Sequence, residues 1–382
     1  MRPTVSADER RARIVVSRIV EPGDVDACRL VRDHSAAALL RRLRAGTDLD
    51  KPKVRDWSER VSRADHDHLM ERAAAVGARY ICPGDDEWPC ALDDLERLED
   101  EAGDRRGGVP FGLWVRGGGH LGRLAERSVA VVGARASTAY GEHVAGDLAF
   151  GCGEAGFSVI SGGAFGIDAA AHRGVLSQGA LTTAILASGV DRLYPPGNTD
   201  LLKRIAESGL VVSEAAPGCV PSRSRFLVRN RLIASLAQGT VVVEAALRSG
   251  SLNTARWALD LSRPVMGVPG PVTAGSSAGV HQLLRHPGTV LVTDAAEVIE
   301  HISPAGVGLA PLKQGPTSPR DRLHPRSRQL LDAIPTVMAA SSQSIARAAG
   351  LSHADVVARL HGLEHLGAVV REDADRWRIA RP

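Results

Sequence analysis

The sequence predicts a doubly wound parallel α/β sheet with an N-terminal helical domain and a C-terminal winged-helix domain. Residues 128–300 alternate short apolar runs with helix-like stretches, as in a parallel sheet covered by helices on both faces. Residues 326–382 contain three helix-like segments followed by two strand-like runs, which is the order of a winged helix. The segment between these regions is rich in proline and glycine, which indicates a linker.

The first domain covers residues 1–75 and is expected to be helical, of the SAM or helix-hairpin type. Its segment Ala7–Ile19 carries many charges, and Ser35–Arg44 is rich in alanine, leucine and arginine. Between them, the sequence Glu-Pro-Gly-Asp at Glu21–Asp24 is typical of a turn. This pattern predicts two short helical hairpins.

The second domain covers residues 76–302 and contains the predicted sheet. Residues 80–116 form a lead-in of short strands and loops that packs on the rest of the domain. Each later strand is a short apolar run, and helix-like stretches such as Ala139–Ala155 and Ala164–Ser177 lie between the runs. The predicted strands are 129–132, 158–160, 183–186, 210–213, 240–243, 264–268 and 289–292.

The C-terminal region consists of a linker over residues 303–325 and the winged-helix domain over residues 326–382. Five prolines and several glycines mark the linker. The following domain has predicted helices at 327–334, 342–349 and 352–366, and predicted strands at 368–370 and 376–379. Residues 321–382 hold nine arginines against seven acids, an excess too small to identify a DNA reader.

The composition is that of a globular protein without a membrane span. The 382 residues suffice for two or three domains, and 44% of them are hydrophobic. No run of about 18 apolar residues occurs, and the polar N-terminus lacks the apolar core of a secretory signal. The five cysteines are scattered and form no CxxC pair, which fits the reducing cytoplasm. We therefore expect a cytoplasmic protein with no membrane contact.

Arginine supplies most of the positive charge. The net charge is +3, and all but four of the 47 basic residues are arginine. Codon usage in a GC-rich genome would explain this excess, although the forked guanidinium also suits phosphate recognition and base stacking. The positions of the arginine clusters are therefore more informative than their number.

Two glycine-rich turns directly follow predicted strands and are candidate phosphate-binding loops. They lie at Val132–Arg135 and at Ser161–Asp168. Glycines let the backbone approach a phosphate closely, and the helix that follows offers free N–H groups. Neither turn has the GxGxxG spacing of a dinucleotide site, and either alone could be a tight turn without a ligand. Two such turns from neighbouring strands would converge on one sheet edge, which favours a shared anion site.

Two further segments add candidate anion-binding groups. Arg223–Arg231, which is expected to start as a loop, has four arginines and no acid. The ring of Phe226 within it suits base stacking on single-stranded nucleic acid. The alternatives are a solvated basic loop and a ring that plugs the sheet edge, and the apolar continuation Leu227-Val228 favours the plug. Arg248–Thr254 contains a Ser-Gly-Ser loop that enters a helix, another arrangement that holds anions.

The sequence motifs of common enzyme classes and metal sites are absent or incomplete in this chain. No GxxxxGK[ST] P-loop occurs. Gly275–Gly279 matches G-x-S-x-G, but no strand directly precedes it, as a nucleophile elbow requires. The histidine pairs His66/His68 and His361/His365 are more typical of surface or packing residues than of metal ligands. We therefore expect no metal and no cofactor.

A series of motifs runs in order through the second domain. Together the motifs resemble the DprA/Smf family, the DNA-processing protein A of bacterial transformation. The resemblance spans about Tyr80 to Glu300, and the flanking domains match in layout only. This chain has Ala134 where serine is usual and Asn253 where an aliphatic residue is more usual. The motifs are Ala130–Arg135 with Tyr140-Gly141, Val159–Asp168 with Ala171-His172, Gly189–Asn198, Ser213-Glu214, Phe226, Arg229–Arg231, Glu244, Arg248–Thr254 and Val268–Gly270.

The resemblance implies a single-stranded DNA-binding protein that is not an enzyme and that dimerises through an extended Rossmann-like fold. Members of the family protect incoming strands during natural transformation and help to load the RecA recombinase onto them. Glu244 would orient an arginine in a basic pocket, or would make only a strand-end ion pair. The residues expected to bind DNA or phosphate are Gly133, Arg135, Ser161, Gly162, Gly163, Arg225, Arg229, Asn230, Arg231, Arg248, Ser249, Gly250 and Ser251.

Two other functions remain open on the sequence. The nucleoside-monophosphate phosphoribohydrolases resemble this core and carry a Pro-Gly-Gly-x-Gly-Thr…Glu signature. Here Gln238–Thr240 and Glu244 occupy the comparable place without the preceding Pro-Gly-Gly. The second alternative is a sensor that binds a small nucleotide and signals through its winged helix.

Overall fold

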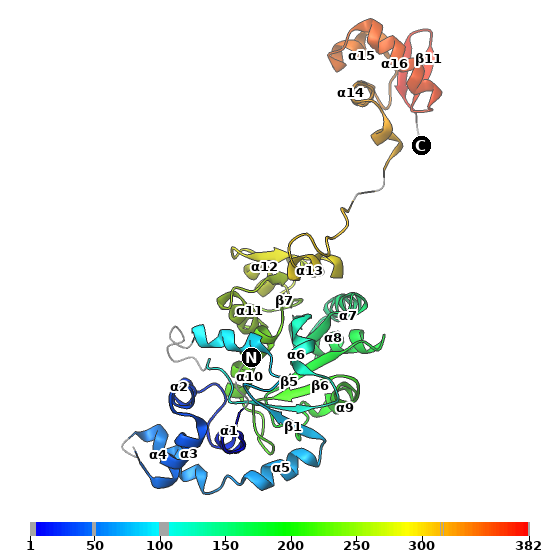
Figure 1. Ribbon diagram of the computed structural model, residues 1–382. Helices are drawn as coiled ribbons and strands as arrows, with labels where there is room; N and C mark the ends of the chain where they lie inside the picture. The colour runs from blue at the N-terminus through cyan, green and yellow to red at the C-terminus, as the bar shows by residue number, and fades with distance from the viewer. Residues whose placement is uncertain (1–4, 48–50, 99–106, 314, 316, 381–382) are drawn as a thin grey trace. The chain divides into compact units, whose positions relative to one another are not determined.

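The centre of the structure, a computed structural model, is a nine-stranded sheet (Figure 1). The structure describes residues 5–47, 51–98, 107–313, 315 and 317–380. The chain divides into two compact units, Met1–Ala310 and Pro311–Pro382, and each unit is described by itself. The N-terminal helices belong to the same unit as the sheet. The four domain ranges given above stay predictions.

Seven strands of the sheet are parallel, in the order β6-β5-β4-β3-β7-β8-β9. The strand order reverses between β3 and β7, which is the doubly wound arrangement that the alternating pattern predicted. Every residue of β3 to β8 is buried, as expected for β-branched runs covered on both faces. The strands are β3 (Ser128–Val132), β4 (Ser158–Ser161), β5 (Thr182–Leu186), β6 (Leu210–Ser213), β7 (Thr240–Val242), β8 (Val265–Gly267) and β9 (Thr289–Leu291).

Two antiparallel strands extend the sheet beyond β6. They are β1 (Ala78–Ile81) and β2 (Leu113–Arg116), and β2 pairs with β6 so that Trp114 lies opposite Ser213. The sequence placed this lead-in against the sheet, whereas the structure makes it part of the sheet. The 3₁₀ helix η1 (Cys90–Leu98) follows β1 and buries its leucines in the core beside α10.

Helices cover both faces of the sheet, and the alternation along β3 shows which face each covers. Val129 and Val131 share a core with α7 (Ala139–Glu154), α8 (Ile167–Leu176) and α13 (Ala295–Ile302). Ala130 and Val132 point the other way, toward α10 (Arg223–Leu236) and α11 (Ser251–Asp260). The remaining helices around the sheet are α6 (Leu121–Glu126), α9 (Thr199–Ser208) and α12 (Ala278–Leu284), and Pro196–Asn198 form the short 3₁₀ helix η2.

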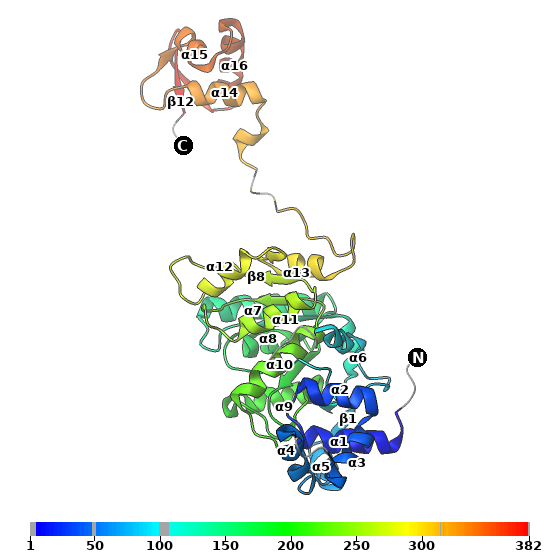
Figure 2. The ribbon, with the colours of Figure 1, turned by 90° about the vertical axis from the view of Figure 1, so that its left-hand side faces the viewer.

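Five N-terminal helices gather at the β1 end of the sheet, away from α12 and α13 (Figures 1 and 2). They have a core of their own around Trp57, which is buried. Ile14 and Leu69 also pack with Tyr80 and Trp114, so these helices are joined to the sheet through apolar contacts. The helices are α1 (Ala7–Ile19), α2 (Val25–His34), α3 (Ala36–Ala45), α4 (Pro52–Val61) and α5 (His66–Ala74).

The second unit has three helices followed by a hairpin, as the sequence predicted for a winged helix. Trp377 and Leu360 lie in its core. The short strand β10 (Ala340–Ser341) pairs with β12 and completes a three-stranded sheet. The elements are η3 (Pro319–Arg322), α14 (Pro325–Ala333), α15 (Ser342–Ala349), α16 (His353–His365), β11 (Val369–Asp373) and β12 (Arg376–Ile379).

Candidate nucleic-acid interface

A cavity of about 780 Å³ opens at the carboxyl ends of β3 and β7, where the strand order reverses. Open α/β sheets bind their ligands at this topological switch point. The turn after β3, the turn after β4, helix α10 and the loop before α11 form the walls. The predicted site residues that line the cavity are Gly133, Arg135, Arg229, Asn230, Arg248, Ser249, Gly250 and Ser251.

The cavity wall is cationic. Arg135, Arg223 and Arg248 are exposed on it, and Arg229 is buried in it. Among the described lining residues, Asp168 is the one carboxylate. This balance of charge favours an anionic ligand such as a phosphodiester. Arg223 is not among the predicted site residues, although it lies in the predicted basic segment Arg223–Arg231.

The basic segment Arg223–Arg231 is the first half of helix α10, not a loop as the sequence analysis expected. Ser222 caps the helix, because its hydroxyl accepts a hydrogen bond from the Arg225 amide at 3.3 Å. Apolar residues of the second half, such as Leu232, are buried against the sheet and hold the helix there. On a helix these four arginines do not share a single face, so they do not all reach one pocket.

Arg225 and Arg231 do not line the cavity, which corrects the prediction that both bind DNA there. Arg225 forms a two-point ion pair with Glu21, with Nε–Oε2 and Nη2–Oε1 distances of 3.0 and 2.9 Å. Arg231 is fully buried and donates to both carboxylate oxygens of Glu214 at 2.8 Å. It also donates to the Gly108 carbonyl at 2.8 Å. Both guanidinium groups are therefore already neutralised inside the protein.

Arg229 lies with its guanidinium across the second glycine turn. It is 6% exposed, and its Nη1 donates to the Gly162 carbonyl at 2.8 Å and to the Ile185 carbonyl. A Cβ on residue 162 would collide with this guanidinium, so any larger residue there would displace the Arg229 side chain. Burial lowers the Arg229 pKa to about 10, which still leaves the group charged at neutral pH. Its Nε has no hydrogen-bond partner among the described residues.

The second glycine turn does not offer the free backbone donors that the sequence predicted. The Asp168 carboxylate accepts from the Gly162 and Ala164 amides at 3.1 and 3.3 Å, so these donors are already used. Ser161 is fully buried, and neither it nor Gly163 lines the cavity. The turn reaches the cavity through Ala164 and Asp168 instead. Burial raises the Asp168 pKa, while the charge of Arg229 and these amides act in the opposite direction.

The wall opposite the glycine turns is tied to α10 by an amide pair. The Asn230 Nδ2 donates to the Gly250 carbonyl at 3.2 Å and to the Asn253 Oδ1 at 3.3 Å. Asn253 is one of the two residues that depart from the family pattern, and its amide oxygen accepts this bond. The Ser249 and Ser251 hydroxyls lie 2.8 Å apart at the start of α11. These small polar groups fix the loop that carries Arg248.

Glu244 takes neither of the two roles considered for it. It is 1% exposed, and its carboxylate accepts from the Thr138 amide at 2.8 Å and from the Thr138 hydroxyl at 2.7 Å. Thr138 caps α7. The carboxylate thus holds the start of α7 against the end of β7 and pairs with no arginine among the described residues.

Phe226 lies in the cavity wall and not in an apolar core, so the predicted plug is wrong. Its side chain is half-buried, and the described core clusters do not include it. The Arg135 and Arg229 guanidinium carbons lie 4.6 and 5.8 Å from its ring centroid. The Tyr194 ring lies 5.9 Å away and also lines the cavity. Tyr194 lies within the Gly189–Asn198 motif and is not among the predicted site residues.

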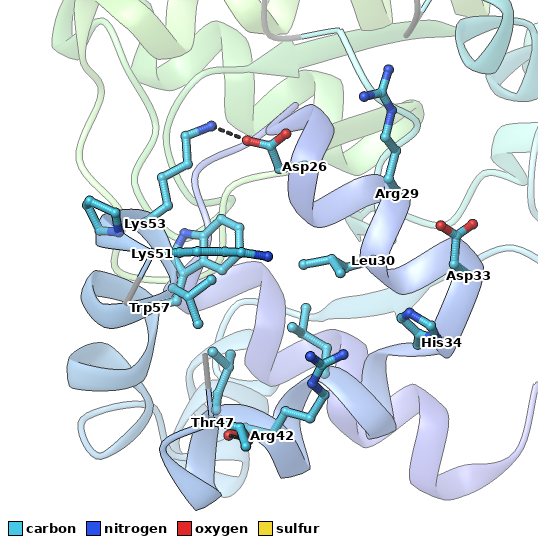
Figure 3. Close-up of a pocket in the computed structure, with 14 residues that line it drawn as sticks. Asp26, Arg29, Leu30, Asp33, His34, Arg42, Thr47, Lys51, Lys53 and Trp57 are labelled. Atoms are coloured by element: carbon cyan, nitrogen blue, oxygen red, sulfur yellow. Dashed lines mark hydrogen bonds and ion pairs between the residues drawn. The ribbon is translucent and has the colours of Figure 1, made fainter. Parts of the chain in front are cut away.

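A second cavity, of about 540 Å³, lies among α2, α3 and α4 (Figure 3). Its lining mixes acids, bases and apolar side chains, including the Lys53–Asp26 ion pair at 2.5 Å and Trp57. This cavity lacks the excess of arginine over carboxylate found at the switch point.

Among the described residues, no cluster of three histidine, cysteine, aspartate or glutamate side chains is arranged to hold a metal ion. None of the described helices is both long and apolar enough to span a bilayer. The switch-point cavity is therefore the candidate nucleic-acid interface.

The fold and this site define a Rossmann-like α/β protein with a cationic crevice at the switch point of its sheet. Residues 79–303 match the family described as DNA recombination-mediator protein A. The chain belongs to this family, also known as DprA/Smf.

Relatives and solved structures agree with this assignment. A Mycobacterium tuberculosis protein that carries the name DprA is 43% identical over 374 residues, which cover 97% of this chain and 94% of that protein. The Streptococcus pneumoniae DprA crystal structure covers 78% of this chain and 98% of its own, with 29% identity and a TM-score of 0.61. A Helicobacter pylori DNA processing protein A structure, described for its single-stranded DNA binding mode, covers 58% and 94%, with 27% identity and a TM-score of 0.50.

Proposed function

We propose that this protein binds single-stranded DNA in the switch-point cavity. The observation that carries the proposal is the combination of four arginines, one internally bonded carboxylate and two aromatic rings around one cavity. Cations that follow the backbone and rings that stack on bases are the features of sequence-tolerant single-strand binding. The Helicobacter pylori relative, whose structure is described by its single-stranded DNA binding, supports the same function here.

We further propose that the protein is a recombination mediator that protects incoming strands during natural transformation and helps to load RecA onto them. It would act in the cytoplasm as a homodimer and catalyse no reaction itself. Membership of the recombination-mediator family supports this role. The simplest test adds the protein to limiting RecA on a single strand and measures RecA filament formation, which should increase.

The phosphoribohydrolase alternative is less well supported by the site. Glu244, the residue at the place of the signature glutamate, is buried and bonded to Thr138. A general acid or base must reach the substrate within hydrogen-bond distance. Release of free base from nucleoside monophosphates by the pure protein would support that alternative, and competition by a mononucleotide against an oligonucleotide would support a nucleotide sensor.

An electrophoretic shift assay across salt concentrations tests the proposed function. We expect single strands to bind more tightly than a duplex of the same length, with little dependence on sequence, because phosphate contacts carry no sequence information. If three or four phosphates are neutralised, the logarithm of affinity should fall against the logarithm of salt with a slope of about −2 to −3. Equal affinity for the duplex would rule out the proposal.

A further inference from the structure

The turn between α1 and α2, residues Glu21–Asp24, reaches across to helix α10. Gly23 has a φ of +69°, which glycine adopts without strain, and the Asp24 amide donates to the Glu21 carbonyl at 3.3 Å to close the turn. The Asp24 carboxylate then caps α2 by accepting from the Ala27 amide at 3.2 Å. The turn is therefore fixed at both ends within the N-terminal helices.

The first contact of this turn with α10 is the ion pair between Glu21 and Arg225. The Arg225 Nε and Nη2 donate to the two carboxylate oxygens of Glu21, and the Arg225 Nη1 donates to the Val220 carbonyl at 2.7 Å. The side chains are only 15% and 29% exposed for Arg225 and Glu21. A two-point pair with little exposure has a more defined geometry than a surface ion pair. The bond lies in the first turn of α10, next to Phe226.

The second contact runs through Glu214 to Arg231, six residues further along α10. The Gly23 amide donates to the Glu214 Oε1 at 3.2 Å. The same carboxylate receives the two 2.8 Å bonds from the fully buried Arg231. The turn therefore touches α10 directly at one arginine and through one carboxylate at another.

The Glu21–Arg225 contact lies beside the DNA cavity and not in it. Pro22, Arg225 and Leu232 line a small neighbouring cavity, Phe226 and Asn230 line the switch-point cavity, and Arg229 lines both. Loss of the Glu21 contact would loosen the first turn of the helix that carries Phe226. We propose that the α1–α2 turn is a positioning element for the DNA-binding helix, with Glu21 as its main contact, which rests on the proposed single-strand function.

A simple charge effect predicts a different result and can be separated from positioning. If Glu21 only repelled DNA, Glu21→Gln would tighten binding and Arg225→Gln would weaken it. If the pair positions α10, both substitutions weaken binding, by about three- to tenfold, in line with typical coupling energies of contacting residues. Glu59→Gln is the matched control, because Glu59 is an exposed acid of α4 whose loss changes the charge equally.

The experiment measures oligonucleotide affinity for the full chain and these three variants, with thermal melting of each. The reversed pair, Glu21→Arg with Arg225→Glu, should recover affinity relative to either single reversal. Hydrogen exchange of the Phe226 amide, which donates to the Ser222 carbonyl at 3.1 Å, should be faster in Glu21→Gln. If the wild-type chain binds single strands and Glu21→Gln binds as well or better, positioning is overturned while the proposed function stands. If the wild-type chain does not bind, the proposed function itself fails.

Discussion

At the scale of single residues, the arginines of α10 show why spacing alone could not identify the site. Arg223 faces the cavity, Arg225 pairs with Glu21, Arg229 is buried in the wall and Arg231 neutralises Glu214. In the sequence these four side chains cannot be told apart, because all are arginines within nine residues. Two of these roles depend on Glu21 and Glu214, acids outside the segment, and no local pattern reports such pairing.

Arg135 and Arg229 should both be needed for single-strand binding, with different effects on stability. Each alanine variant removes a charge-assisted contact worth about 1.5–3 kcal/mol, which is about tenfold to a hundredfold in affinity. Arg135 is exposed, so Arg135→Ala should melt normally. Arg229→Ala should also lower the melting temperature, because the Gly162 and Ile185 carbonyls lose their donor. Unchanged oligonucleotide affinity in both variants would show that these arginines are only structural.

Phe226→Ala should weaken oligonucleotide binding more than it weakens the fold. Base–aromatic stacking is worth about 1–3 kcal/mol per base, whereas truncation of a core phenylalanine costs about 3–5 kcal/mol of stability. Phe226 is half-buried beside Arg135 and Tyr194 and lies outside the described cores, so the smaller stability loss applies. Melting and affinity measured on the same variant separate the two. A large drop in melting temperature with unchanged affinity would instead support Phe226 as a packing residue that plugs the sheet edge.

At the scale of elements, the parallel strands could be predicted from the sequence, but the pairing of β1 and β2 with the sheet could not. Runs such as 129–132 and 210–213 are apolar on both faces, a pattern typical of buried parallel strands. In the structure each is a strand whose ends differ from the predicted bounds by at most a residue or two. The antiparallel strand β1 pairs with β2, and β2 pairs with β6, about a hundred residues later in the chain. Pro217, Gly218 and Pro221 precede α10 and favour a loop there, although Ser222 is a good cap.

The contact between α8 and β5 should make folding stability depend on pH through His172. This histidine is fully buried, its Nδ1 donates to the Thr182 hydroxyl at 2.8 Å, and burial lowers its pKa from 6.5 to about 3. The unfolded chain therefore binds one more proton than the folded chain between these values. Stability should fall as the pH decreases below 6.5, by about 1.4 kcal/mol per pH unit from this group.

Urea unfolding at pH 7, 6 and 5 measures this dependence. His172→Asn keeps a donor near Nδ1 and removes the titrating group, so its stability should change less with pH than that of the wild type. His143→Asn is the control, because His143 is exposed on α7. Equal slopes for the wild type and His172→Asn would contradict the assignment.

At the scale of the whole molecule, the described residues of the binding cavity and the winged helix belong to different units. Every described residue that lines the switch-point cavity belongs to the unit Met1–Ala310. In the other unit, several arginines are already paired with acids, as in Arg326 and Arg359 with Asp355, and Arg378 with Glu372. None of the described residues of this unit lines the switch-point cavity.

A chain that ends at Ala310 should therefore retain single-strand binding. We expect its affinity for an oligonucleotide to stay within about twofold of the full chain, a difference of about 0.4 kcal/mol, because all described cavity residues remain. The full chain should unfold in two thermal steps, since the units have separate cores, and the truncated chain should lose one of them. The measurement pairs calorimetry with the same electrophoretic assay. A tenfold loss of affinity with the remaining melting step unchanged would show that the winged helix contributes directly to DNA binding.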